Sequence, residues 1–447
     1  MKERALFATK IGVIAATVGS AVGLGNFWRF PYEAGTHGGG AFLLVYLGCV
    51  LLIGIPVMCA EFIIGRGTHK NISGALKQLL PGTKYYRFSF IGITASILIL
   101  SFYSVVAGWT MEYALQALLG NLSASDSAAY SERFNQFCSS NWRPLMWTLI
   151  FLFVNAMIIL RGVQKGIERI SNILLPLLFL MLVAFAVNSL TLPGAADGLR
   201  FLFSPDFSQI TPSVILGAMG QAFFSLSLGL SCLLVYSSYF SDSTKLVRSA
   251  SIIAVLDTVV AVMSGVVIFP AVFSFGAEPS QGPKLVFEVL PSIFAMMPGG
   301  YLWAVLLFVL LFFASITSSI SMSEISIAYF TEEFSMSRTR ATCTLTAIAV
   351  VLGACCALSF GMLSDFKIAG MTVFDLFDFV SSNVLLPIGG FIFSIYVGWI
   401  LDRKMVKNQL TNDGKIKVYS YRLIIFCMRW VAPIAILMIF LCGLHIL

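Results

Sequence analysis

The sequence is poor in charged residues, which make up 11% of its 447 residues, whereas soluble domains carry about 25%. Its three histidines (His37, His69 and His445) form no HExxH pattern, and its nine cysteines form no CxxC pair. A zinc hydrolase, a thiolate metal site and a disulfide framework are therefore disfavoured. Period-two alternation is also absent from the apolar segments, so they do not resemble the strands of a membrane barrel. These absences favour a helical membrane protein.

Long apolar stretches account for most of the chain, and 58% of its residues are hydrophobic. A helix needs about 20 mainly apolar residues to cross a bilayer, and the backbone inside lipid must satisfy its own hydrogen bonds. The first stretch has no small-residue cleavage site, so we expect no removable signal peptide. We predict eleven transmembrane helices, at about 11–35, 40–65, 88–119, 143–160, 167–190, 212–240, 245–274, 301–331, 340–360, 373–401 and 423–446.

The net charge of +7 follows the sidedness of the loops. With a cytoplasmic N-terminus, most of the 28 basic residues fall in segments predicted to lie inside. Those predicted to lie outside are Arg133, Arg143, Arg200, Lys284 and Lys367. The positive-inside rule therefore places the N-terminus in the cytoplasm and, with an odd number of spans, the C-terminus outside. Because topology accounts for the basicity, we expect no nucleic-acid partner.

Two predicted spans carry clusters of helix-breaking residues. The first contains GSAVGLGN over residues 19–26, and the sixth contains FSLSLGLS over residues 224–231. Each glycine costs a helix about 1 kcal/mol relative to alanine, so such clusters at mid-membrane depth need a reason. One reason is close helix packing through small residues. The other is an unwound segment that faces a ligand, which is tolerated only where it lines a protein-enclosed cavity.

The two clusters lie five spans apart. Matching breaks in spans one and six are typical of inverted-repeat secondary transporters, whose site lies near the bilayer midplane. We therefore predict an all-α membrane protein with a single domain over residues 1–447. The first repeat would span about 1–190 (helices 1–5), the inverted second repeat about 205–402 (helices 6–10), and one extra helix about 423–446.

Four motifs carry a family resemblance: GSAVGLGNFWRFP at 19–31, GGGAF at 38–42, GQAFFSLSLG at 220–229 and ASITSS at 314–319. In this order, over essentially the whole chain, the sequence resembles the neurotransmitter:sodium symporters (LeuT-type), in particular their bacterial amino-acid branch. The family's usual twelfth span is missing here, as in several bacterial members. The resemblance implies a symporter, not an enzyme, that couples sodium to amino-acid uptake across the bacterial cytoplasmic (inner) membrane by alternating access.

The resemblance also implies two sodium sites built from hard oxygen ligands. The ligands implied for the first sodium are Ala21, Asn26, Ser225 and Asp257. Those implied for the second are Gly19, Val22, Ala314, Thr317 and Ser318. For the hydroxyls of Thr317 and Ser318, the alternative is ordinary hydrogen bonding to the preceding helical turn.

Asp257 stands where the family usually has asparagine. In chloride-dependent relatives an anion lies beside the first sodium, and the residues here that match its surroundings are Tyr46, Gln221 and Ser225, while Ala261 replaces the anion-binding serine. An intramembrane carboxylate is functional by default. We therefore expect Asp257 to supply the negative charge that chloride provides elsewhere, and we expect no chloride requirement. A protonated, structural aspartic acid is the alternative.

The substrate site is also implied by the resemblance. Tyr103 matches the tyrosine that bonds the substrate carboxylate, and the freed amides of Leu24 and Gly25 present a positive helix end to an anion. Gly23 stands where monoamine carriers have aspartate, which favours an α-amino acid. The implied lining carries no charge, so a neutral hydrophobic or aromatic L-amino acid fits best. That lining comprises Ala21, Gly23, Leu24, Gly25, Ile99, Tyr103, Phe224, Ser225, Ser227, Leu230, Ser318 and Met322.

Two gates follow from the same resemblance. The outer gate would comprise Arg29, Asp378, Tyr103 and Phe224, and the inner gate Arg4, Glu332 and Tyr239. In the fifth span, Gly166 and Pro176 either let the inner half unwind to admit water or form a packing kink. The sequence leaves the role of Glu324 open.

Overall fold

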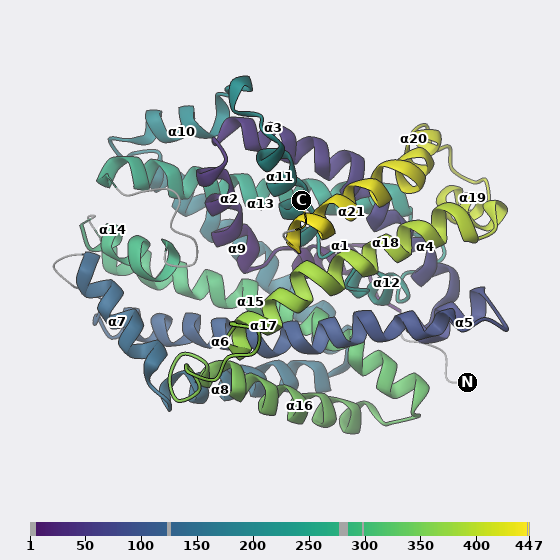
Figure 1. Cartoon of the computed structure of the whole chain (residues 1–447), viewed down its shortest axis with the longest axis horizontal. Coiled ribbons are helices and arrows are strands. Elements are labelled where there is room, and N and C mark those ends of the chain that lie inside the picture. The colour runs from purple at the N-terminus through teal and green to yellow at the C-terminus, as the bar shows by residue number, and fades with distance from the viewer. Residues whose placement is uncertain (1–5, 123–126, 277–284, 297–298, 445, 447) are drawn as a thin grey trace.

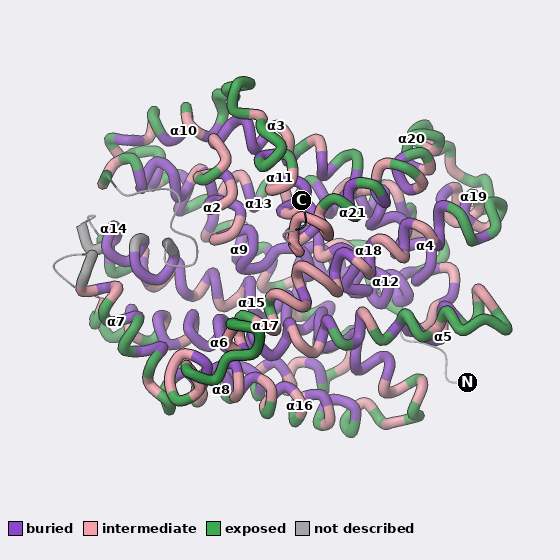
Figure 2. The backbone as a smooth tube through the Cα atoms, in the orientation of Figure 1, coloured by how far each residue is buried: buried purple, intermediate pink, exposed green. Residues whose placement is uncertain are grey.

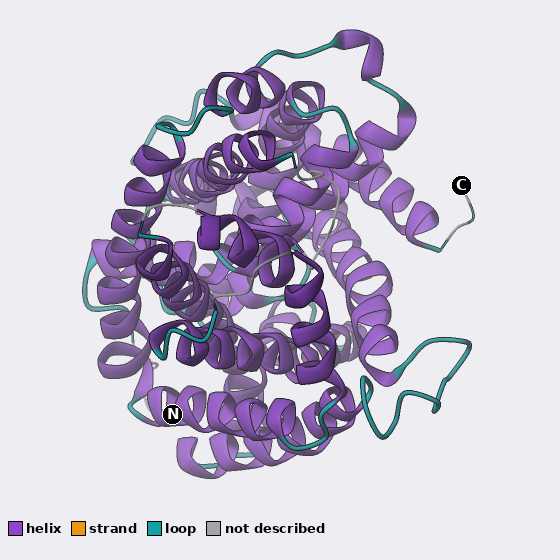
Figure 3. Ribbon diagram, turned by 90° about the vertical axis from the view of Figure 1, so that its left-hand side faces the viewer, coloured by secondary structure: helices purple, strands orange, loops and turns teal. Residues whose placement is uncertain are grey.

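The computed structural model describes residues 6–122, 127–276, 285–296, 299–444 and 446. Within these ranges the chain forms helices joined by short connections, and its only strand-like pairing is an isolated bridge between Ile368 and Met371. Figure 3 shows the resulting helical bundle. The predicted all-α fold class is confirmed.

Many of the helices are short segments of longer spans. The α-helices are α1 (Lys10–Ala21), α2 (Phe30–Thr36), α3 (Gly40–Cys49), α4 (Ile55–Thr68), α5 (Ile72–Leu79), α6 (Ser89–Leu118), α7 (Ser127–Ser139), α8 (Arg143–Leu160), α9 (Arg169–Ser189), α10 (Ala195–Phe203), α11 (Pro212–Ser225), α12 (Cys232–Ser237), α13 (Leu246–Phe275), α14 (Leu290–Met296), α15 (Gly300–Glu333), α16 (Arg338–Leu358), α17 (Val373–Phe379), α18 (Leu386–Ile395), α19 (Arg403–Thr411), α20 (Tyr421–Phe426) and α21 (Ala432–Gly443). Turns of π-helix continue or join several of them, at Gly25–Arg29, Val50–Gly54, Val163–Glu168, Leu285–Val289, Val380–Leu385, Tyr396–Ile400 and Cys427–Val431. Tyr85–Phe88 and Phe207–Gln209 form 3-10 turns.

Polar residues at the loop ends start several of these helices. The Asn71 side chain accepts hydrogen bonds from the amides of Ser73 and Gly74 at the start of α5. Ser337 and Thr372 accept similar bonds at the starts of α16 and α17. A side-chain acceptor satisfies one of the four free amides at a helix N-terminus, so these positions end the loops and fix where the spans begin.

Nine helices in the described ranges are long and apolar enough to cross a membrane. They are Gly40–Thr68, Tyr85–Leu118, Arg143–Leu160, Val163–Ser189, Leu246–Phe275, Gly300–Glu333, Arg338–Leu358, Val373–Ile400 and Tyr421–Gly443. The pair Lys10–Ala21 and Gly25–Thr36, bent by 53°, forms a tenth. The one predicted span that is left, the sixth at about 212–240, corresponds to α11 and α12, which are separated by a six-residue break, so neither half reaches the length of a full span. The predicted number of eleven spans is consistent with the described helices.

The connecting segments gather at the two ends of the bundle (Figure 1). The basic helices α5 and α19 lie at the end where the described N-terminal residues begin, and α7, α10 and α14 lie at the opposite end. This separation agrees with the predicted distribution of basic loops. The division into two inverted repeats stays a prediction.

The long helices α6 and α15 pack against each other along the centre of the bundle. Buried residues concentrate on these inner helices, and exposed residues follow the outer surfaces (Figure 2). Many of the exposed residues are large and apolar, for example Phe153 on α8 and Leu180 and Val187 on α9. An apolar outer surface is what a helix facing acyl chains requires.

Candidate functional site

The first helix break lies between α1 and the π-helical turn Gly25–Arg29. Val22 has an extended backbone conformation, which releases the following amides from the helix. Gly23 donates its amide hydrogen to the Asn26 side-chain oxygen at 3.0 Å, and Asn26 donates its amide hydrogen to the Gly23 carbonyl at 3.1 Å. The break is therefore narrower than the motif 19–26 indicated, because the helix continues to Ala21.

The second break spans residues 226–231, between α11 and α12. Ser227, Gly229 and Ser231 all have positive φ angles, which only glycine adopts without strain. The fully buried Glu61 side chain of α4 lies against this break. It accepts hydrogen bonds from the amides of Gly229 at 2.8 Å and Leu234 at 3.2 Å. A buried carboxylate thus satisfies amides that the broken helix leaves free.

Replacing Glu61 by glutamine should lower the melting temperature by a few degrees. The amide side chain keeps one accepting oxygen, so one of the two backbone donors loses its partner, at a cost of about 1–3 kcal/mol. Thermal unfolding of purified protein in detergent measures this effect. The control is Glu132→Gln on the exposed face of α7, which should leave the melting temperature unchanged. Equal melting temperatures for the two variants would contradict this role of Glu61.

The two breaks meet α13 at a polar cluster around Asp257. The fully buried Asp257 carboxylate accepts hydrogen bonds from the Asn26 amide nitrogen at 2.8 Å and the Ser225 hydroxyl at 2.6 Å. The Asn26 amide nitrogen also donates to the Ser225 hydroxyl at 3.1 Å. Three of the four residues predicted for the first sodium therefore lie in direct contact. The fourth, Ala21, is the last residue of α1 and directly precedes the first break.

Buried polar atoms without partners surround this cluster. The Tyr46 hydroxyl lies near Ser225, Thr258 and the Asp257 carboxylate. Among the described residues, no hydrogen-bond partner exists for the Tyr46 hydroxyl, the Thr258 hydroxyl or either end of the Gln221 amide. Most buried polar groups in proteins are hydrogen-bonded. The cluster therefore offers donors and acceptors that the protein itself leaves unused.

Tyr103 of α6 lies against the first break. The Leu24 amide donates to its hydroxyl at 3.4 Å, and a methyl group on Gly23 would lie 2.6 Å from the Ser318 hydroxyl and 3.2 Å from the Tyr103 hydroxyl. A methyl group on Gly25 would lie 2.7 Å from the Phe224 ring. The glycines therefore let the backbone approach these side chains closely. The other residues predicted to line the substrate site are buried or half-buried: Ile99, Ser227, Leu230 and Met322.

The residues predicted for the second sodium join α1 to α15. The Ser318 hydroxyl donates to the Val22 carbonyl at 3.2 Å. The Thr317 hydroxyl donates to the Ala314 carbonyl at 3.0 Å, and Thr317 also contacts the Gly19 position. Each of the two hydroxyls therefore lies beside one carbonyl of the predicted set. The hydrogen bond from Thr317 to Ala314 is also the ordinary bond to the preceding helical turn, which was the alternative left open from the sequence.

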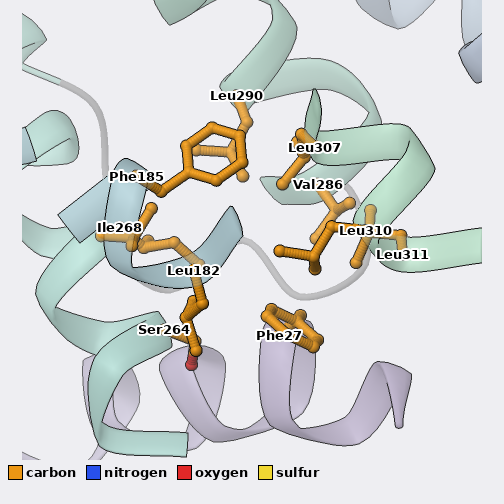
Figure 4. Close-up of a pocket in the computed structure, with 11 residues that line it drawn as sticks. Phe27, Leu182, Phe185, Ser264, Ile268, Val286, Leu290, Leu307, Leu310 and Leu311 are labelled. Atoms are coloured by element: carbon orange, nitrogen blue, oxygen red, sulfur yellow. The ribbon is translucent and has the colours of Figure 1, made fainter. Parts of the chain in front are cut away.

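Phe27 points into an apolar cavity (Figure 4). The other lining side chains come from α9, α13, α14, α15 and the π-helical turn Leu285–Val289, and Ser264 is the one hydroxyl residue among them. Its volume of about 10 Å³ is at the lower limit for one water molecule. Ser264 turns its hydroxyl to the Asn26 carbonyl. The wall behind the polar cluster is therefore essentially dry, which strengthens electrostatic interactions in front of it.

The predicted outer ion pair between Arg29 and Asp378 is not formed in this structure. Arg29 lies 3.7 Å from the Glu33 carboxylate and stacks over the Phe224 ring at 4.4 Å. Asp378 instead accepts a hydrogen bond from the Ser382 hydroxyl at 2.8 Å. The physical reason is that Glu33, one turn away on the same helix, is the nearer partner. Asp378 still lies within electrostatic reach of Arg29.

Glu33 also contacts His37, which directly follows α2. The His37 ring lies 3.2 Å from the Glu33 carboxylate. This hydrogen bond raises the pKa of His37 above its usual value, against the opposing effect of partial burial. Arg29, Glu33 and His37 therefore form one charged group along and just after α2.

The predicted inner gate is described only in part. Arg4 lies outside the described residues. Glu332 accepts hydrogen bonds from the Asn71 backbone and side-chain amides at 2.8 and 2.9 Å. The Tyr239 hydroxyl donates to the Glu324 carboxylate at 2.6 Å.

Glu324, whose role the sequence left open, is the centre of a buried ion pair. Arg338 donates to both of its carboxylate oxygens, at 3.0 and 2.7 Å. Because Arg338 begins α16, this pair ties α15 to α16 and to the Tyr239 segment. A bidentate arginine–carboxylate pair is a strong, directional contact.

The fifth span remains helical between Gly166 and Pro176. Gly166 lies in the π-helical turn Val163–Glu168, and Pro176 lies within the continuous helix α9. Over residues 163–189, all of which are described, the predicted unwinding is not observed. Glu168 at the end of this turn accepts hydrogen bonds from the Ala8 and Thr9 amides at 2.9 and 3.1 Å.

Three residues that contribute to this site were not predicted from the sequence: Glu61, Ser264 and Thr258. A sequence signal existed only for Glu61, which is an acid within a predicted span and so a functional candidate by default. Hydroxyl residues are common in membrane helices, so Ser264 and Thr258 carry no distinguishing signal. Their place in the cluster becomes visible only through the packing of α13 against the first break.

Comparisons with known proteins give consistent matches over the whole chain. A model of the Sodium:neurotransmitter symporter family matches residues 4–143 and 131–447. The chain is 39% identical to the sodium-dependent transporter YhdH of Bacillus subtilis, over 97% of this chain and 96% of that protein. It is 34% identical to a sodium-dependent transporter of Haemophilus influenzae, over 99% of both. The crystal structure of MhsT in complex with L-phenylalanine superposes with a TM-score of 0.90 at 43% identity, covering 99% of this chain and 100% of that one.

Proposed function

Because this chain belongs to the sodium:neurotransmitter symporter family, we propose that it takes up neutral hydrophobic or aromatic L-amino acids with sodium and without chloride. It is a multi-pass membrane protein and a sodium-dependent symporter. The proposal adds the substrate class, the number of sodium ions, the chloride independence and the residues that bind each. Alternating access of one central site would couple the two fluxes.

One observation carries the proposal: both helix breaks converge on the cluster formed by Asn26, Ser225 and Asp257. The first sodium would bind in this cluster together with the Ala21 carbonyl. The second would bind between α1 and α15, at the oxygens of Gly19, Val22, Ala314, Thr317 and Ser318. Carbonyls at helix ends and hydroxyl oxygens are suitable ligands for sodium.

The substrate carboxylate would lie between the first sodium and the Tyr103 hydroxyl. The freed amides of Leu24 and Gly25 would stabilise its negative charge. The side chain would contact Ile99 and Leu230, both buried and apolar, together with the more adaptable Met322. The relative with bound L-phenylalanine supports an apolar or aromatic side chain.

We place the chain in the cytoplasmic membrane with its N-terminus inside. The basic segments at one end of the bundle support this orientation through the positive-inside rule. In this orientation the Arg29–Glu33–His37 group faces outward, and the Glu324–Arg338 pair faces the cytoplasm. Arg29, Phe224, Tyr103 and Asp378 would close the outer side of the site, and Arg4, Glu332 and Tyr239 the inner side.

Purified protein should be stabilised against heat by leucine and tryptophan in sodium but not in choline. Ligand bound only to the native state raises the melting temperature by mass action. Glutamate, lysine and tyramine should give no shift, because the lining has no charge to pair with a charged side chain and the site needs the substrate carboxylate. A shift of equal size in choline would contradict sodium coupling, and a larger shift with glutamate or tyramine would contradict the pocket assignment.

A further inference from the structure

A second cavity lies at the N-terminal ends of α1 and α13 and along α9, on the side of the bundle where the described chain begins. Its volume is about 530 Å³, which is in the range of a ligand site. The three helices pack against one another, and the cavity occupies the space between their ends. None of the residues assigned to the substrate or to sodium lines it.

Three basic side chains border the cavity. Lys10 comes from α1, Lys245 immediately precedes α13, and Arg248 lies in its first turn. All three are exposed, and none has an ion-pair partner among the described residues. No acidic residue lines the cavity.

Two carboxylates beside the starts of α1 and α13 have partners outside the cavity. Glu168 is buried against the start of α1, where it accepts the Ala8 and Thr9 amides and the Thr9 hydroxyl. Asp242 lies 3.1 Å from the His69 ring. The rim of the cavity therefore carries a net positive charge that the protein does not neutralise there.

The interior of the cavity is apolar. Its walls include Val13 and Ile14 of α1, Leu175 and Pro176 of α9, and Ile252 of α13. The neighbouring outward positions are apolar and exposed as well: Ile173 and Leu177 on α9 and Val255 on α13. These faces are suited to acyl chains, so the apolar interior continues into a lipid-facing surface.

We propose that this cavity binds an anionic phospholipid of the cytoplasmic leaflet. The phosphate would lie among Lys10, Lys245 and Arg248, and an acyl chain would fill the apolar interior. Basic pockets between transmembrane helices on the cytoplasmic side suit anionic headgroups. The inference uses the orientation proposed above but not the identity of the substrate.

Native mass spectrometry of the full chain, with dioleoyl phosphatidylglycerol and dioleoyl phosphatidylethanolamine added in equal amounts, tests this site. Wild type should retain phosphatidylglycerol preferentially. The Lys245→Gln/Arg248→Gln variant should lose affinity for it by about fivefold for each basic side chain removed. The control, Lys415→Gln/Lys417→Gln, removes two exposed basic residues that do not line the cavity, and it should retain the lipid like wild type.

Ile252→Trp provides an independent variant, because it fills the interior and leaves the basic rim intact. It should also lose the lipid. Heat stabilisation by sodium and leucine serves as the check that each variant is folded. Glycerol phosphate, which has the headgroup without acyl chains, should neither bind nor displace the lipid at equal concentration. Equal retention of the two lipids by wild type, unchanged retention in both cavity variants, or displacement by glycerol phosphate would overturn the proposal.

Discussion

Replacing Asp257 by asparagine is expected to weaken sodium binding about a hundredfold and to abolish uptake at ordinary sodium concentrations. Opposite unit charges 4 Å apart attract by about 4 kcal/mol at an effective dielectric constant near 20, and part of this loss is offset by the amide oxygen. Asp257 is fully buried and bonded to Asn26 and Ser225, so little solvent screens the charge. Sodium titrations of substrate binding measure the effect.

The control for general loss of an acid is Asp365→Asn in an exposed connection, which should bind sodium like wild type. Unaltered sodium affinity in the Asp257 variant would leave this residue a structural, protonated acid.

Chloride should become necessary only when the Asp257 charge is lost. Wild-type uptake into proteoliposomes should be unchanged when gluconate replaces chloride. Asp257→Asn combined with Ala261→Ser should recover uptake only with chloride present, because an anion can then bind among Tyr46, Gln221 and the introduced hydroxyl. The unpaired atoms of Tyr46 and Gln221 would supply hydrogen-bond donors for it. A chloride requirement in wild type would refute this assignment.

The double variant Thr317→Ala/Ser318→Ala should abolish sodium-dependent uptake while the protein remains folded. It removes two of the oxygens proposed for the second sodium, and Ser318 is also the residue that bonds the Val22 carbonyl across to α1. Uptake of labelled leucine into proteoliposomes, with and without a sodium gradient, measures the loss. Thermal unfolding confirms that the variant is folded.

Thr331→Ala is the matched control on the same helix. The Thr331 hydroxyl donates only to carbonyls of the preceding turn, those of Ile327 and Ala328. If the Thr317 hydroxyl had the same purely local role, the single variant Thr317→Ala would behave like Thr331→Ala. Full uptake by the double variant would exclude a sodium site at these oxygens.

The positions of both helix breaks could be predicted because they depend on local composition. Glycine and serine clusters in the first and sixth spans weaken the helix wherever they occur, and the breaks lie within them, at 22–24 and 226–231. The contact between Asn26 and Asp257 was expected only through the family resemblance. No periodicity in the sequence relates a residue of the first span to one of the seventh.

Other parts of the site depended on competition between partners. Arg29 can reach Glu33 on its own helix or Asp378 on another, and sequence alone does not rank two carboxylates by distance. In the structure, the Arg29 side chain lies 3.7 Å from the Glu33 carboxylate. Glu324 was recognisable as a buried acid, but its pairing with Arg338 depends on how α16 begins beside α15.

The sequence by itself determined the membrane-spanning helices, which connecting segments are basic and which segments cannot stay helical. These properties follow from hydropathy, loop charge and backbone propensity, which each segment carries regardless of its neighbours. Only the tertiary structure decided that the Glu61 carboxylate accepts hydrogen bonds from the amides freed at the second break. It also decided that the Phe27 side chain lines a small apolar cavity, and that three basic residues border a second apolar cavity beside α1. These contacts join residues more than 100 positions apart, and their energies depend on distance and burial, which exist only once the helices have packed.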